Sequence, residues 1–443
     1  MTNTNLAPSP PILTSWKQKL ALALAGAGVL LLLLVGLARD AFAPLPVLLF
    51  SLSLMAAGVL LFVRVEYLRR PEGIQNNGVW FRSLSARGVW AWLAAIVLTG
   101  FYTALYFGPA AWFEGLSDLF SPLSRLLKGK PADKWFVYGS LYTFSVLVMG
   151  LKFGFKYRHS RYQVIRTISV SFFQLGFAFL IPAFMQAMNQ PEYYFTYFWP
   201  LKDWYGTPSA ANYFGGYAIG PYLLVFGALM TFVATPLLTW FFGKRWYCSW
   251  VCGCGGLAET AGDPFRHLSD KSLRAWKIER WMIHGVLVAV VLVTGLLWLN
   301  SYQKGAVLGS WSQTFYTWYG YIIGMAFSGV VGVGFYPLMG SRVWCRFGCP
   351  QAAILGIFQK KKSKFRITAN GGQCISCGNC STYCEMGIDV RHYAQRGQDV
   401  VRASCVGCGI CAAVCPRGVL RLEGAGDDVD NRAAALRTEQ VKI

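Results

Sequence analysis

Eight apolar runs, each about as long as a bilayer is thick, constrain the fold of this chain more than any other feature. The hydrocarbon core of a bilayer requires about 20 apolar residues per helix, and the central part of each run contains no Asp or Glu. The runs span residues 20–38, 42–63, 88–109, 135–155, 167–188, 213–242, 281–299 and 317–340. The sequence therefore predicts a polytopic α-helical membrane protein with about eight transmembrane helices.

The composition agrees with this interpretation. Charged residues make up 14% of the chain and hydrophobic residues 55%, whereas soluble domains carry about a quarter charged residues. The first run ends near Ala41-Phe42-Ala43, which is similar to a signal-peptide cleavage site. The run is longer than an ordinary signal-peptide core, and seven further runs follow it, so we interpret it as a retained helix.

Lysine and arginine alternate along the connections as the positive-inside rule predicts. Both terminal segments and the second, fourth and sixth connections are basic, whereas the first, fifth and seventh connections each have a single Lys or Arg. The third connection departs from this pattern, with Arg125, Lys128, Lys130 and Lys134, but it is long enough to hold an interfacial helix. We expect a bacterial inner-membrane protein with both termini and every cysteine on the cytoplasmic side.

The net charge of +21 is explained by this topology. Basic residues next to transmembrane helices are attracted to anionic lipid at the cytoplasmic surface. We therefore expect the lipid bilayer, and no nucleic acid, as the partner of these charges.

Eight of the thirteen cysteines form two repeats near the C-terminus, each with the spacing Cys-x2-Cys-x2-Cys-x3-Cys. Three cysteines at this spacing wrap a tight loop around one [4Fe–4S] cluster, and the fourth ligates the cluster of the other repeat. The repeats predict an α+β, bacterial-type ferredoxin domain with two clusters. The expected ligands are Cys374, Cys377, Cys380 and Cys415 for the first cluster, and Cys405, Cys408, Cys411 and Cys384 for the second.

Two glycines of these repeats support the cluster prediction, and one glutamate departs from the usual repeat. Gly378 and Gly409 each follow the second cysteine of a repeat and suit a tight backbone. A structural zinc site needs four ligands, usually in two separated pairs, and would leave the third cysteine of each repeat without a role. Glu385 stands where the first repeat would normally have proline, and we expect it to change the local backbone and the reduction potential without affecting ligation.

The remaining cysteines lie at the ends of the sixth and eighth runs, in two Cys-x3-Cys pairs. At this spacing two thiols can share one face of a helical turn, and the basic neighbours Lys244, Arg245 and Arg346 would stabilise thiolates. The pairs predict a third cluster or other metal site, a redox-active dithiol–disulfide couple, or structural thiols. The residues are Cys248 and Cys252, Cys345 and Cys349, with Cys254 as a spare thiol or substitute ligand.

The order of these features resembles the membrane polyferredoxins. Cys345-Arg-Phe-Gly-Cys349-Pro350 is similar to the signature of that family, whereas Cys248-Ser-Trp-Val-Cys252 is followed by Gly253 in place of proline. The resemblance covers about residues 240–420. The family includes a nitrous-oxide-reductase maturation protein, a quinol-oxidising accessory subunit of nitrate reductase and a copper reductase of cytochrome-oxidase assembly. The resemblance implies membrane-associated electron transfer with other redox protein subunits.

We therefore expect a membrane-bound iron–sulfur protein that passes electrons between a cytoplasmic redox partner and a membrane acceptor such as quinone. His284, near the start of the seventh run, is the candidate for a quinone site, and a packing role is the alternative for this residue. The alternative function is an assembly or maturation factor that supplies electrons to a metal centre, such as copper, in a client respiratory enzyme. Whether the chain acts as an oxidoreductase within a complex stays open.

Four segments are expected along the chain. A transmembrane domain covers 1–341 and includes a cytoplasmic cysteine loop at 244–280. A linker over 342–370 carries the second Cys-x3-Cys pair, and the dicluster ferredoxin domain covers 371–423. The acidic end over 424–443 is expected to be a disordered tail.

Overall fold

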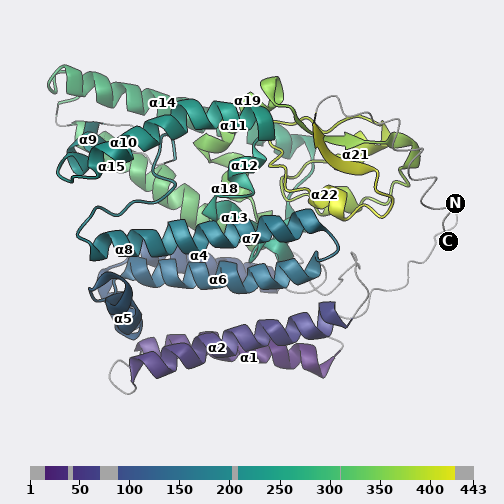
Figure 1. The fold of residues 1–443 in the computed structure, drawn as a ribbon, viewed down its shortest axis with the longest axis horizontal. Helices are drawn as coiled ribbons and strands as arrows, with labels where there is room; N and C mark the ends of the chain where they lie inside the picture. The colour runs from purple at the N-terminus through teal and green to yellow at the C-terminus, as the bar shows by residue number, and fades with distance from the viewer. Residues whose placement is uncertain (1–14, 38–42, 70–87, 202–207, 310, 425–443) are drawn as a thin grey trace. The chain divides into compact units, whose positions relative to one another are not determined.

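The computed structural model describes residues 15–37, 43–69, 88–201, 208–309 and 311–424 (Figure 1). The expected tail from residue 425, and several residues used to predict orientation, among them Arg39, Arg70 and Lys202, lie outside these ranges. The chain divides into two compact units, so the segment expected as one transmembrane domain is shared between them. The first unit comprises Met1–Phe195, Gly256–Leu268 and Gly329–Ser341, and the second comprises Thr196–Gly255, Ser269–Ser328 and Arg342–Ile443.

Seven helices among the described residues are long and apolar enough to cross a membrane. They are Trp16–Gly36, Pro44–Leu68, Val89–Phe107, Lys134–Lys156, Arg161–Ala187, Gly220–Phe242 and Leu273–Tyr302. These spans confirm the prediction of a polytopic helical membrane protein, with seven candidate spans instead of about eight.

The eighth predicted run, 317–340, is helical but divided. It consists of α15 (Trp311–Tyr319), the π-helical segment η6 (Gly320–Val331), α16 (Gly332–Gly334) and α17 (Tyr336–Met339). The run is rich in glycine, which is a poor helix former, and Pro337 cannot donate a backbone hydrogen bond. The eighth transmembrane helix predicted over this run is therefore not among the candidate spans of the described residues.

The first unit is a set of packed helices. Buried side chains of α1, α2, α5 and α6 form one apolar core, which includes Leu32, Leu48, Phe120 and Phe136. Helix α5 occupies the third connection, where the sequence left room for an interfacial helix, and Gly129 ends it in the left-handed conformation. The elements are α1 (Trp16–Leu37), α2 (Pro44–Val63), η1 (Arg64–Leu68), α4 (Val89–Phe107), η2 (Ala110–Phe113), α5 (Glu114–Lys128), α6 (Lys134–Lys156), α7 (Arg161–Leu175), η3 (Gly176–Leu180) and α8 (Ile181–Ala187).

Buried ion pairs join the short segment 256–268, which contains η5 (Asp263–Leu268), to α6 and α7 of the first unit. The carboxylate of Asp263 lies 2.7 Å from Nζ of Lys156 and 3.6 Å from Nζ of Lys152. Arg166 of α7 pairs with Glu259. Since a buried charge is costly unless it is paired, these contacts hold the segment in place.

The second unit contains α14, its longest helix, and the cysteine-bearing segments. Its elements before residue 342 are α9 (Pro208–Gly215), α10 (Gly220–Leu229), η4 (Met230–Ala234), α11 (Thr235–Phe242), α12 (Arg245–Cys248), α14 (Leu273–Tyr302) and α15. Helix α13 (Gly253–Glu259) begins in this unit and ends in the first. Ser272 caps α14 by accepting a hydrogen bond from the amide of Ala275, as N-cap serines commonly do.

The segment expected as a linker, 342–370, is ordered into α18 (Val343–Phe347), α19 (Pro350–Lys362) and β1 (Phe365–Ala369). Strand β1 pairs antiparallel with β2 (Leu420–Gly424) and forms an isolated bridge from Ile367 to Val400. We call residues 365–424 the ferredoxin module. Its short helices are η7 (Gly371–Gln373), α20 (Asn379–Thr382), α21 (Val390–Gln395) and α22 (Ile410–Ala413).

Candidate functional site

One pocket of the ferredoxin module is lined by three cysteines of the first repeat and by the last cysteine of the second. These four residues, which we call the first site, are Cys374, Cys377, Cys380 and Cys415. The structure thus brings together the four cysteines that the spacing assigned to one cluster, and their ligation of a cluster stays a prediction. Four thiols around one pocket are the donor set that a [4Fe–4S] cluster requires, so the residues present fit this group.

The first site opens to solvent on one side. Cys377 is exposed, whereas Cys380 is 8% exposed. Burial raises the pKa of the Cys380 thiol to about 11, while the backbone N–H of Ser381 opposes the rise. Arg391 and Arg417 line the same pocket, and both are exposed.

The other four cysteines of the repeats are more deeply buried, with Cys405 and Cys411 buried and Cys384 and Cys408 half-buried. We call this set, Cys405, Cys408, Cys411 and Cys384, the second site. Burial raises the pKa of Cys405 to about 11, and the nearby Cys384 adds to the rise. Burial also raises the pKa of Cys411 well above its usual value, with further contributions from Cys408, Cys405 and Cys384. Cys384 is therefore close enough to Cys405 and Cys411 of the second repeat to influence their thiols.

The two repeats use the same unusual backbone. Gly378 and Gly409 have φ of 82° and 72° and precede α20 and α22, as their positions after the second cysteine predicted. Two residues earlier in each loop, Ser376 and Gly407 also have positive φ, of 58° and 63°. Such a conformation is strained for residues other than glycine. Gln395 donates a hydrogen bond of 2.8 Å to the hydroxyl of Ser376.

The two Cys-x3-Cys pairs have matching local structures. Each first cysteine lies in a short helix, Cys248 in α12 and Cys345 in α18. Each second cysteine donates its backbone N–H five residues back, from Cys252 to the carbonyl of Tyr247 at 2.8 Å and from Cys349 to that of Trp344 at 2.9 Å. The pairs therefore bracket a helix end, which differs from the expectation that both thiols share one helical turn. We call these four cysteines the membrane-proximal site.

The thiols of the membrane-proximal site influence one another. Burial raises the pKa of Cys248 to about 12; Lys244 opposes this rise, and Cys252 and Cys345 add to it. A hydrogen bond from Cys254 is the largest cause that lowers the pKa of Cys252, to about 7. Because buried thiols hold their protons, a metal bound here must displace them.

The basic residues expected beside these thiols have different roles. Lys244 is fully buried and donates from Nζ to the carbonyl of Ala403 at 3.3 Å. Arg245 stacks on the Phe365 ring, with 4.4 Å from its guanidinium carbon to the ring centroid. Arg346 pairs with Glu279 at 3.1 Å. The guanidinium that reaches a thiol is instead that of Arg342.

No motif in the sequence pointed to Arg342. Its Nη1 donates to the carbonyl of Cys248 at 3.2 Å and lies 3.8 Å from Sγ of Cys345. Its Nη2 lies 2.9 Å from the carboxylate of Glu385. The only available signal was an arginine three residues before a cysteine, which is not specific enough to identify the contact.

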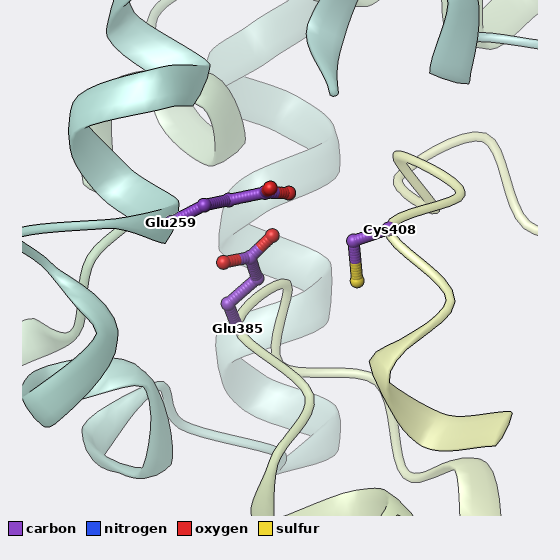
Figure 2. A group of neighbouring side chains, drawn as sticks. All are labelled: Glu259, Glu385 and Cys408. Carbon is purple, nitrogen blue, oxygen red and sulfur yellow. The ribbon is translucent and has the colours of Figure 1, made fainter. Parts of the chain in front are cut away.

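Glu385, the residue that replaces proline in the first repeat, is fully buried in the second unit. A carboxylate oxygen of Glu385 and Sγ of Cys408 lie within 4.8 Å of each other. Figure 2 shows that these two side chains come from different loops of the ferredoxin module. Ser269 fixes the backbone of Glu385 by donating to its carbonyl at 2.6 Å.

Hydrogen bonds within the second unit fasten the loop of the second site to the helices that carry the membrane-proximal site. Ser249 donates from its hydroxyl to the carbonyl of Val406 at 2.8 Å. Gln359 of α19 donates to the carbonyl of Cys405 at 2.7 Å and accepts from the backbone of Lys244 at 2.6 Å. The second and membrane-proximal sites therefore belong to one packed region.

His284, the residue considered for a quinone site, lies on α14. Its Nδ1 is 2.7 Å from the carbonyl oxygen of Arg280, one turn earlier in the same helix. This contact is local to the helix, so it does not distinguish a packing role from a ligand-binding one.

Models of known protein families match the segments that carry these sites. Residues 373–420 match the family model of a 4Fe–4S dicluster domain, and residues 224–272 and 322–368 match that of a 4Fe–4S binding domain. The first match contains the first and second sites. The other two ranges contain one Cys-x3-Cys pair each, in agreement with their matching local structures.

Curated relatives match over about a third of the chain. YccM of Escherichia coli (strain K12), named for an inferred role in electron transport, is 28% identical over 172 residues, which are 37% of this chain and 46% of YccM. The methylamine utilization ferredoxin-type protein MauN of Paracoccus denitrificans is 29% identical over 155 residues, 32% of this chain and 48% of MauN. This chain thus spans about half the length of the curated relatives it matches. No solved structure matches it.

Proposed function

Because this chain is a membrane polyferredoxin-like 4Fe–4S protein, we propose that it relays electrons between a redox protein in the aqueous phase and an acceptor in the membrane. When bound, [4Fe–4S] clusters supply one-electron carriers. The first and second sites are the proposed ligand sets of two of them. We propose the membrane-proximal site, Cys248, Cys252, Cys345 and Cys349, as the ligand set of a third.

The observation that carries this proposal is the order in which the three sites are covered. Cys377 of the first site is exposed, whereas Cys405 and Cys411 of the second site are 7% and 6% exposed. Cys248 of the membrane-proximal site is 5% exposed. A surface partner can approach the first site, whereas the cysteines of the other two sites are buried or half-buried.

The residues around the sites have separate tasks in this proposal. Arg391 and Arg417 give the open side of the first site a positive charge, which would attract an acidic carrier. Lys244 and Arg342 place buried positive charge beside the membrane-proximal thiols, and this charge stabilises thiolates. Gln359 and Ser249 keep the second site fixed to the segment that carries those thiols.

We propose a quinone as the membrane acceptor, because it is a redox carrier dissolved in the bilayer that the seven candidate spans would cross. His284 is the residue of this chain proposed to bind it. The acceptor for an assembly factor would instead be a metal centre such as copper.

Electron transfer in liposomes tests the proposal. The purified full-length protein is reconstituted, reduced with dithionite and mixed with decyl-ubiquinone while the visible absorbance of the clusters is followed. The wild type should be reoxidised rapidly, whereas the Cys345→Ser, Cys349→Ser double variant should keep the iron of the ferredoxin module and react slowly. Equal rates for the two proteins would remove the membrane-proximal site from the pathway.

Two further arms identify the acceptor. A slower reaction of His284→Ala with decyl-ubiquinone alone, at unchanged iron content, would support the quinone site, and an unchanged rate would contradict it. Reoxidation by copper(II) but not by decyl-ubiquinone would favour the maturation function.

A further inference from the structure

Glu385 stands where the repeat would normally have proline, and its carboxylate makes an ion pair that proline could not make. Its side chain is fully buried although it carries a carboxylate, and it pairs with Arg342, which is 1% exposed. An ion pair this deep in the protein is costly to assemble and is weak evidence for a stabilising role. The pair is better explained by the effect of its two charges on the groups around them.

The positive end of the pair lies at the membrane-proximal site. Nη1 of Arg342 is 3.8 Å from Sγ of Cys345 and 3.2 Å from the carbonyl oxygen of Cys248. One guanidinium therefore touches both Cys-x3-Cys motifs. A positive charge and a hydrogen bond at a ligand sulfur both raise the reduction potential of an iron–sulfur centre.

The negative end of the pair lies at the second site. A carboxylate oxygen of Glu385 is within 4.8 Å of Sγ of Cys408 (Figure 2), and Glu385 follows Cys384 directly in the chain. A negative charge at this distance in a buried region disfavours an added electron. It therefore lowers the potential of a centre held by the second site.

We infer that the Arg342–Glu385 pair is an electrostatic bias that favours electrons at the membrane-proximal site over the second site. This inference rests on the proposed function, because it takes the two cysteine sets as redox centres. It adds a direction: electrons that enter at the ferredoxin module are drawn toward the membrane. Arg342 and Glu385 are positioning residues for charge and are not ligands.

The test is an EPR-monitored redox titration of the purified full-length protein and three single variants. Glu385→Gln keeps the shape and removes the negative charge. Glu385→Asp keeps the charge. Glu279→Gln, which removes the carboxylate of the buried Arg346–Glu279 pair, controls for the loss of an ion pair as such.

Glu385→Gln should raise the midpoint potential of the second-site centre so that its reduction equilibrium changes at least tenfold, which is about 59 mV for one electron. Glu385→Asp should restore most of the wild-type potential, and Glu279→Gln should leave the second-site potential unchanged. Arg342→Gln should lower the potential of the membrane-proximal centre, and Arg342→Lys should recover part of that loss.

Iron content separates the possible outcomes. If Glu385→Gln retains wild-type iron and its second-site potential does not move, the inference is overturned. If Glu385→Gln loses iron, the midpoint potentials of Glu385→Asp and Arg342→Lys are compared with those of the wild type instead. Wild-type potentials in Arg342→Gln would then overturn the inference. A protein with no membrane-proximal iron would refute the third centre in the proposed function, while the second-site shift in Glu385→Gln would still test the effect of Glu385.

Discussion

Replacing Gly407 by alanine should loosen the loop that carries Cys405 and Cys408. Gly407 has φ of 63°, and a Cβ atom there would lie 2.7 Å from Cβ of Arg245 and 3.0 Å from a ring carbon of Phe365. Neither atom is the free end of a flexible side chain. The backbone of the second site therefore lies this close to Arg245 of α12 and Phe365 of β1 only because residue 407 lacks a side chain.

Two effects add in this variant. A non-glycine residue in the left-handed region costs about 1–2 kcal/mol, and overpacking a close contact costs about 1–3 kcal/mol. Gly418→Ala is the matched control, since φ of Gly418 is 61° and its added Cβ would meet nothing within 4 Å. The two variants should thus differ by about 1–3 kcal/mol, which corresponds to about 5–150-fold in an equilibrium constant.

Iron release to a chelator measures this difference. The purified full-length proteins are mixed with excess bathophenanthroline, and the rate of iron loss is followed by absorbance. Gly407→Ala should lose iron about 5–150 times faster than Gly418→Ala at matched temperature. If the two variants release iron at the same rate, the close approach of Gly407 to Arg245 and Phe365 does not hold the second site.

Three other predictions follow from the structure. Cys252→Ser should lose about four irons per chain. Cys254→Ser should keep them, because we place Cys254 as a hydrogen-bond donor to Cys252 and not as a ligand. Iron analysis checks this, and a loss of iron in both variants would make Cys254 a ligand. Burial alone would raise the pKa of Asp263, but the buried lysines of α6 hold it well below its usual value, so this carboxylate should stabilise the fold above about pH 4 and stop doing so as the pH falls further. Thermal unfolding in detergent should show that Asp263→Asn costs about 3–5 kcal/mol near neutral pH and much less in acid, and an equal cost at both pH values would contradict the pairing. Arg391→Glu should slow reduction by a reduced acidic ferredoxin and weaken its dependence on salt, whereas Arg421→Glu, outside the pocket of the first site, should have little effect in the same stopped-flow assay.

The sequence was sufficient for features that depend on local spacing. Apolar run length predicted seven of the helices because each must match the bilayer by itself. The cysteine repeats predicted the crossed grouping of Cys374 with Cys415, because the tight loops follow from spacing and from glycines such as Gly378. The division of the run 317–340 was not predicted, because hydropathy carries no information on where a helix is interrupted. The ordered structure of 342–370 was not predicted either, because hydropathy does not show strand pairing with residues far along the chain.

Contacts between distant side chains had no sequence signal. Glu385 was recognised as a departure from the repeat, but its partner Arg342 lies 43 residues earlier in the chain. Lys244 was expected to act on the thiols, yet its amine also reaches Ala403, which belongs to the ferredoxin module. Pairings of this kind depend on how helices and loops pack, and no periodic pattern in the sequence encodes them.

The central claim is that the ferredoxin module and the membrane-proximal cysteines form one set of redox centres. Iron and acid-labile sulfide analysis of the purified full-length protein, combined with an EPR-monitored redox titration, tests this claim most directly. We predict about twelve irons per chain and three one-electron centres, with one centre lost when Cys345 and Cys349 are replaced by serine. About eight irons and two centres, unchanged in that variant, would contradict it.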